Sequence, residues 1–165
     1  MLVPKELDSA EECIRCILHP LMYSKSQQKL KREAMLPPRG SNKVSLLRLK
    51  YTEEGLPFCI RHGKSLSVNG HTFVGLASVT PQMVNECSDS VLKQYSLKAE
   101  VVYAPMHQGK YIDPNIDIDT KDPNIDLPMH ADLTYSKAEE GDVKTELRMF
   151  ANELVKRVGF VEVTE

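Results

Sequence analysis

The chain has no tryptophan, only four cysteines in 165 residues, and no apolar run that approaches the ~20 residues of a membrane-spanning helix. These absences argue against a membrane protein and against a small secreted scaffold, in which cysteines are much denser. The opening residues are acidic and contain Pro4, so they lack the charged and apolar regions of a secretory signal. We therefore expect a cytoplasmic protein with reduced thiols that does not bind a membrane.

Glycine-rich and serine-centred fingerprints are missing as well. The sequence contains no GxGxxG, no GxxxxGK[ST] and no GxSxG, which are typical of dinucleotide-binding proteins, P-loop NTPases and α/β-hydrolases. These function classes are therefore disfavoured, and we predict no cofactor.

What is present is a set of short apolar segments with turn signals between them. Asn69-Gly70 is a strong hairpin dipeptide that separates residues 65–68 from residues 71–79. Alternating or continuous apolar residues predict strands at residues 44–49, 71–79, 97–104, 129–135 and 160–163.

Helices are expected mainly towards the two ends of the chain. Helical spacing of apolar residues predicts the first helix at 8–19 and the last at 142–158. Further helices are predicted at residues 25–35 and 81–87, and residues 58–66 are compatible with a short one. We expect an α+β fold with a mostly antiparallel sheet, helices near both termini, and a single domain (residues 1–165) with a long polar loop at 105–128.

The charge is segregated along the sequence. Residues 25–50 contain eight basic residues and one acidic residue, whereas residues 100–142 contain three basic and ten acidic residues. The two segments either neutralise one another or meet partners. We predict a small partner-binding or accessory module that uses both segments, with a protein as its partner. A nucleic-acid-associated protein is one alternative. The residues predicted to bind the partner are Lys29, Lys31, Arg32, Arg39 and Lys43.

An enzyme is the other alternative. Arg61-His62-Gly63 resembles the Arg-His-Gly motif of the histidine phosphatase superfamily. The resemblance implies a hydrolase or phosphoryl-transfer enzyme in which a strand delivers His62 as the phosphate acceptor and Arg61 binds the phosphoryl oxygens. It further implies a second histidine, for which His130 is the candidate, and a second arginine, for which Arg48 and Arg148 are candidates.

His130 and Asp132 form a second catalytic candidate. On the strand predicted at 129–135 they would share one face, and an aspartate can orient an imidazole and raise its basicity. If there is an active site, we place it at this pair, with His62 and Arg48 as convergent partners. Arg48 lies in a buried segment, so the alternative for it is a structural ion pair with an aspartate of the 105–128 loop.

The cysteines offer weak metal-ligand candidates. Cys13-x-x-Cys16 and Cys59-x-x-His62 have spacings that occur in zinc sites. Cys13 borders an apolar stripe, however, and free cysteines are commonly buried. We therefore favour unligated thiols and predict no metal.

Overall fold

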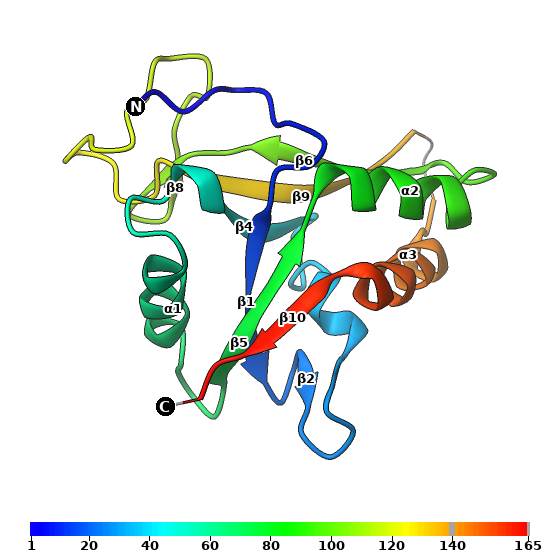
Figure 1. Cartoon of the computed structure of the whole chain (residues 1–165). Helices are drawn as coiled ribbons and strands as arrows, with labels where there is room; N and C mark the ends of the chain where they lie inside the picture. The colour runs from blue at the N-terminus through cyan, green and yellow to red at the C-terminus, as the bar shows by residue number, and fades with distance from the viewer. Residues whose placement is uncertain (139–140, 165) are drawn as a thin grey trace.

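Six strands form one antiparallel sheet in the order β10-β5-β1-β4-β9-β6 (Figure 1). The computed structural model describes residues 1–138 and 141–164. The sheet strands are β1 (Cys13–His19), β4 (Lys43–Arg48), β5 (Thr72–Val79), β6 (Leu97–Tyr103), β9 (His130–Lys137) and β10 (Gly159–Glu162). The helices are α1 (Leu56–Ser65), α2 (Pro81–Val91) and α3 (Lys144–Arg157). The predicted α+β class with an antiparallel sheet is confirmed.

Short elements complete the fold. One small hairpin pairs β2 (Tyr23–Ser24) with β3 (Lys29–Leu30), and another pairs β7 (Met106–His107) with β8 (Lys110–Tyr111). Two 3-10 turns, η1 (Arg32–Met35) and η2 (Leu49–Tyr51), flank β4. Within the described residues, none of the helices has both the length and the apolar character that crossing a membrane requires.

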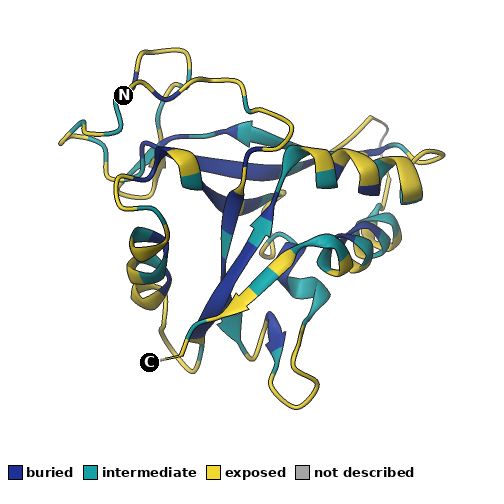
Figure 2. Cartoon of the chain, viewed as in Figure 1, coloured by how far each residue is buried: buried dark blue, intermediate teal, exposed yellow. Residues whose placement is uncertain are grey.

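Both faces of the sheet are covered, so the protein has two apolar clusters. Helices α2 and α3 and the turn η1 pack on one face, around buried residues such as Leu46, Leu133 and Phe150. Helix α1, the N-terminal segment and part of the 105–128 loop cover the other face, around Leu47 and Phe73. Figure 2 shows the central strands as largely buried between these two layers. Adjacent residues of β4 thus face opposite clusters, as the pleat of a strand requires.

The two halves of the sheet meet at a short junction. β1 pairs with β5 over seven residues but with β4 only at Cys13–Arg48 and Ile14–Leu47. Figure 1 shows β9 and β6 running across the direction of β1 and β5. The half-buried Arg15 side chain lies beside the point where pairing ends, because its Nε donates to the Ala34 carbonyl (3.0 Å) and its Nη1 to the Ser45 carbonyl (3.3 Å).

Arg48 occupies the junction itself and is fully buried. Its guanidinium binds both carboxylate oxygens of Glu11, with Nε 2.6 Å from Oε2 and Nη2 3.0 Å from Oε1. It also donates to the carbonyls of Pro4 and Glu6 and lies over the rings of Tyr51 and Tyr103. The sequence-based expectation of an ion pair with a loop aspartate is wrong, because Glu11 takes that place.

Two predicted helices are also wrong. Residues 8–19 contain strand β1, whose Cys13 and Ile17 face one cluster and whose Ile14 and Cys16 face the other. A strand that is buried on both faces gives a nearly continuous apolar run, which imitates helical spacing. Residues 25–35 contain β3 and η1 rather than a helix. Gln28 adopts a positive φ of 51° there, which is incompatible with a continuous helix.

Most of the other predicted strands and helices agree with the structure to within a few residues. The strands predicted at 44–49, 97–104, 129–135 and 160–163 are β4, β6, β9 and the edge strand β10. The helices predicted at 81–87 and 142–158 are α2 and α3, and residues 58–66 fall mostly in α1. The Asn69-Gly70 turn forms between Val68 and His71, but Ser65 still belongs to α1, so the first arm of that hairpin is only a single bridge.

We expect Glu11→Ala to lower the free energy of unfolding by about 3–5 kcal/mol, because it leaves the buried Arg48 charge without its partner. Urea denaturation followed by far-UV circular dichroism measures the change. Arg61→Ala is the matched control, since it removes an exposed ion pair with Glu54 and should leave the midpoint nearly unchanged. Equal effects of the two substitutions would contradict a structural role for the Arg48–Glu11 pair.

Candidate active site

A small cavity on the α1 face brings two of the predicted catalytic residues together. It has a volume of about 30 Å³, which is the space of a single water molecule. His62 comes from α1 and His130 from the first position of β9. The cavity is lined by Ile14, Arg15, Cys16, Ser45, Leu46, Leu47, His62, Leu66 and His130.

Helix α1 is held close to the sheet, and this places His62. A side chain at Gly63 would overlap the ring of Phe73 on β5, so the absence of a Cβ permits the approach. Phe58 stacks on the imidazole of His62, with ring centroids 6.3 Å apart and an angle of 4° between the planes. His62 is half-buried as a result.

The hydrogen bonding of His130 decides which ring nitrogen can act as a base. Its Nδ1 lies 2.8 Å from the Ala104 carbonyl oxygen. A carbonyl oxygen can only accept, so Nδ1 carries the proton and Nε2 of the neutral ring has a free lone pair. The side chain is 3% exposed, and Nε2 lies 3.9 Å from Oδ1 of Asp132.

Asp132 presents a second acceptor at the same place. It is 1% exposed, and its Oδ2 accepts a hydrogen bond of 2.7 Å from the Tyr111 hydroxyl. Its Oδ1 is buried and has no hydrogen-bond partner among the described residues. Two acceptors 3.9 Å apart, Nε2 of His130 and Oδ1 of Asp132, therefore face one another. A group with two hydrogens to donate, such as water, satisfies both.

The Tyr111 side chain contacts this cluster and also reaches the protein surface. Its ring meets His130 edge-on, with centroids 6.3 Å apart, and Nζ of Lys43 lies 4.3 Å from the ring centroid. Burial and the Asp132 carboxylate raise the pKa of Tyr111 to about 12, so its hydroxyl stays protonated and donates to Asp132. The ring is half exposed, which leaves this side of the cluster open to a ligand.

Both histidines are biased towards the neutral form. Burial lowers the pKa of His130, although the Asp132 charge and the bond to Ala104 oppose this effect. Burial also lowers the pKa of His62, with a further contribution from His130 and an opposing one from Asp126. At neutral pH each imidazole can therefore accept a proton.

The predicted arginines lie elsewhere. Arg48 is bound to Glu11 at the strand junction and does not line the cavity. Arg61 points to Glu54 on the exposed side of α1, with Nη1 2.7 Å from Oε2. His62 sits within a helix, not at the end of a strand as the histidine phosphatase resemblance implies. The structure thus brings His62, His130 and Asp132 together but places neither Arg48 nor Arg61 beside His62. The other candidate, Arg148, lies on α3, which covers the opposite face of the sheet.

The cysteine pairs do not assemble either. Cys13 belongs to the cluster on the α2 and α3 face, whereas Cys16 and Cys59 belong to the α1 face. Burial raises the pKa of the Cys13 and Cys16 thiols to about 12 and that of Cys59 to about 11. All four cysteines are free, and no group of three or more His, Cys, Asp or Glu side chains in the described part of the chain could hold a metal ion.

The basic segment (25–50) and the acidic segment (100–142) form no ion pair with one another within residues 1–138 and 141–164. The predicted partner-binding residues are also divided. Lys43 belongs to the histidine face, whereas the others lie on or after the β2–β3 hairpin: Lys29, Lys31, Arg32 and Arg39.

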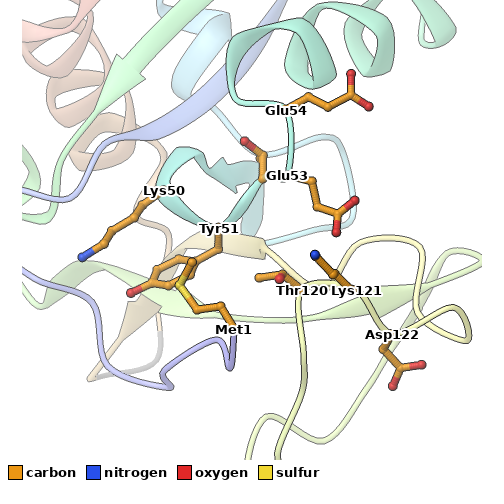
Figure 3. A pocket seen from close by; sticks show the side chains of 9 residues that line it. Met1, Lys50, Tyr51, Glu53, Glu54, Thr120, Lys121 and Asp122 are labelled. Carbon is orange, nitrogen blue, oxygen red and sulfur yellow. The ribbon is translucent and has the colours of Figure 1, made fainter.

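A larger open cleft lies between the N-terminal segment, the 49–54 turn and the 105–128 loop. Its volume is about 1070 Å³. Figure 3 shows Lys50, Glu53, Lys121 and Asp122 around it, and these charges of both signs do not point to one common centre. The cleft therefore offers space without an arrangement of groups that suggests a reaction.

Sequence reasoning missed Arg15 and Tyr111. Arg15 is a lone charge within the apolar run of β1, and that isolation is its only signal. Tyr111 follows a tight turn in which Gln108 and Gly109 have positive φ values of 51° and 77°. The Gln-Gly dipeptide could have indicated the turn, but not that it would bring Tyr111 to Asp132.

Comparisons with known proteins add no relative: no family model matches the chain, and no curated protein and no solved structure matches it. Its function is therefore inferred from its own side chains.

We expect both His62 and His130 to titrate below the ordinary histidine pKa, in the direction that burial imposes. Asp132→Asn should lower the pKa of His130 further, because it removes the negative charge that favours the imidazolium. Because their pKa values are lowered in the folded protein, the two histidines bind fewer protons there than in the unfolded chain. Their contribution to the free energy of unfolding is therefore fully present above the ordinary histidine pKa, and it is lost as the pH falls through the pKa values of the folded protein. Imidazole NMR titration of wild type and variant measures the shift, and an increase on substitution would contradict the contact.

Proposed function

We propose that this protein is a hydrolase in which His130 is the general base. The observation that carries the proposal is the pair of facing acceptors, Nε2 of His130 and Oδ1 of Asp132, beside a cavity that has the volume of a water molecule. The proton on Nδ1, held by Ala104, leaves Nε2 as the basic atom. A buried pair of this kind needs a ligand that donates hydrogen bonds, and water is both the ligand and the nucleophile of hydrolysis.

Each residue of the cluster has a separate role in the proposed hydrolysis. Water donates one hydrogen to Nε2 of His130 and the other to Oδ1 of Asp132, which directs its oxygen lone pair away from both. As the oxygen attacks, its proton passes to His130, and the neighbouring Asp132 carboxylate stabilises the imidazolium. The leaving group takes its proton from solvent, which reaches the cavity on the side of the partly exposed His62.

Release of p-nitrophenol from p-nitrophenyl acetate and p-nitrophenyl phosphate tests this function. Wild-type protein should release it, and His130→Ala should slow the rate by about 10²–10⁴-fold, the contribution of a positioned general base. His71→Ala is the control, since His71 lies in the turn before β5 and outside the cavity. The hydrolase is contradicted if wild type releases no product or if His130→Ala matches wild type.

A partner-binding role is the second candidate. It is supported by the absence, in the described residues, of ion pairs between the basic and acidic segments. Lys29 is exposed on the β2–β3 hairpin, with the half-buried Lys31 and Arg32 beside it. We propose that this hairpin meets an acidic protein surface, with nucleic acid as the alternative partner.

Affinity purification from cells, with quantification of the bound proteins, tests this second role. Reversing Lys29, Lys31 and Arg32 to Glu should remove the partner, because the attraction becomes repulsion. Lys98→Glu on the edge strand β6 is the control that retains it. A complex that is unchanged in the triple variant would contradict the role, and release of the partner by nuclease would favour nucleic acid.

A cytoplasmic location is also part of the proposal. It is supported by the four free, buried cysteines, which fit a reducing compartment.

A further inference from the structure

We propose that β6 (Leu97–Tyr103), one edge strand of the sheet, is the surface at which two copies of this chain pair (Figure 1). The two β6 strands run antiparallel about a two-fold axis at Ala99, so that the six strands of each copy join into one continuous sheet. Pairing at this edge does not depend on the hydrolysis proposed above.

The outer edge of β6 presents backbone groups to a further strand. The Ala104 N–H, just after β6, donates to the His130 carbonyl (3.0 Å), so the even-numbered residues of β6 direct their backbone groups towards β9. Successive residues of a strand alternate in this direction. The N–H and C=O groups of Leu97, Ala99 and Val101 therefore point outward, where the described part of the chain provides no neighbouring strand. Such a row is a template for pairing with another strand.

The charges of β6 fit a second copy in one register. Lys98 and Glu100 are exposed, share one face of the strand, and form no ion pair among the described residues. With the axis at Ala99, Lys98 of each copy lies directly opposite Glu100 of the other, and opposite charges in such positions stabilise a strand pair. On the other face of the sheet, Leu97 of each copy lies opposite Val101 of the other. An axis at Glu100 would instead oppose two carboxylates.

The space beside β6 also suits a second strand. β6 has seven residues, whereas the other edge strand, β10, has four. A groove of about 560 Å³ borders Val101, Val102 and Tyr103, and residues 5–7 of the N-terminal segment form its other side. Tyr95 is 46% exposed in a single copy and comes two residues before β6. In the proposed register Tyr95 of the second copy lies opposite Tyr103, at this groove, so pairing covers an exposed aromatic ring.

Pairing at β6 leaves the other candidate surfaces as they are. Because the two-fold axis is perpendicular to the sheet, the α1 faces of both copies lie on the same side. The two β9 strands are then three strand spacings apart, about 14 Å. No residue of β6 lines the cavity beside His130, and the β2–β3 hairpin belongs to a separate small sheet. Dimer formation can therefore be measured separately from hydrolysis and from binding at the hairpin.

Sedimentation velocity over a series of protein concentrations tests the pairing. Wild-type protein should form a concentration-dependent dimer. Lys98→Glu and Glu100→Lys should each weaken association about 10-fold or more, because each variant opposes two like-charged pairs across the axis. An equimolar mixture of the two variants should dimerise again, since every opposed pair then combines opposite charges.

Two further variants complete the experiment. Lys64→Glu is the control, because it makes the same change of charge at an exposed position on α1 and should leave association unchanged. Ala99→Pro removes an outward N–H and should abolish the dimer, and far-UV circular dichroism verifies its fold, since proline is tolerated where the N–H of an edge strand faces solvent. Wild-type protein that stays monomeric, a dimer that Lys98→Glu and Ala99→Pro both leave intact, or a mixture of the two charge variants that stays monomeric overturns the proposal.

Discussion

The buried ion pair between Arg48 and Glu11 connects the N-terminal segment to the junction between the two halves of the sheet. Arg48 lies where the two halves of the sheet meet, and β1 and β4 share only two residue pairs there. Its side chain fixes the N-terminal segment through Pro4, Glu6 and Glu11, while its backbone N–H donates to the Met129 carbonyl (3.0 Å). Met129 immediately precedes His130, so Arg48 stabilises both the junction and the start of β9.

The candidate site follows from that junction. Because pairing between β1 and β4 ends after Ile14, Arg15 and Ser45 come together where the strands are no longer bonded to one another. The cavity lies at this place, with His62 brought by α1 and His130 by β9. A sheet with continuous pairing would have closed this space. The short junction thus lacks some backbone hydrogen bonds between β1 and β4, and it leaves a small, mainly apolar cavity that both histidines line.

The sequence predicts the helices and strands in which the apolar residues follow a single clear periodicity. Residues 129–135 alternate cleanly, so the strand and the shared face of His130 and Asp132 were both predictable, and the apolar stripe of residues 142–158 identifies α3. β1 was not predictable in the same way, because both of its faces are buried and its apolar spacing imitates a helix. His62 was singled out by a motif, yet its role in the cavity depends on the packing of Gly63 against Phe73. Arg15 and Tyr111 reach the site only through the strand junction and a loop hairpin, which local patterns do not encode.

The proposed reaction requires that His130 offers a free Nε2 lone pair beside Asp132. ¹⁵N NMR of the imidazole nitrogens, at a pH above the ordinary histidine pKa, measures this directly, since protonated and unprotonated ring nitrogens resonate apart. We expect Nδ1 of His130 to carry the proton and Nε2 to be unprotonated. A proton on Nε2, with Nδ1 unprotonated, would contradict it.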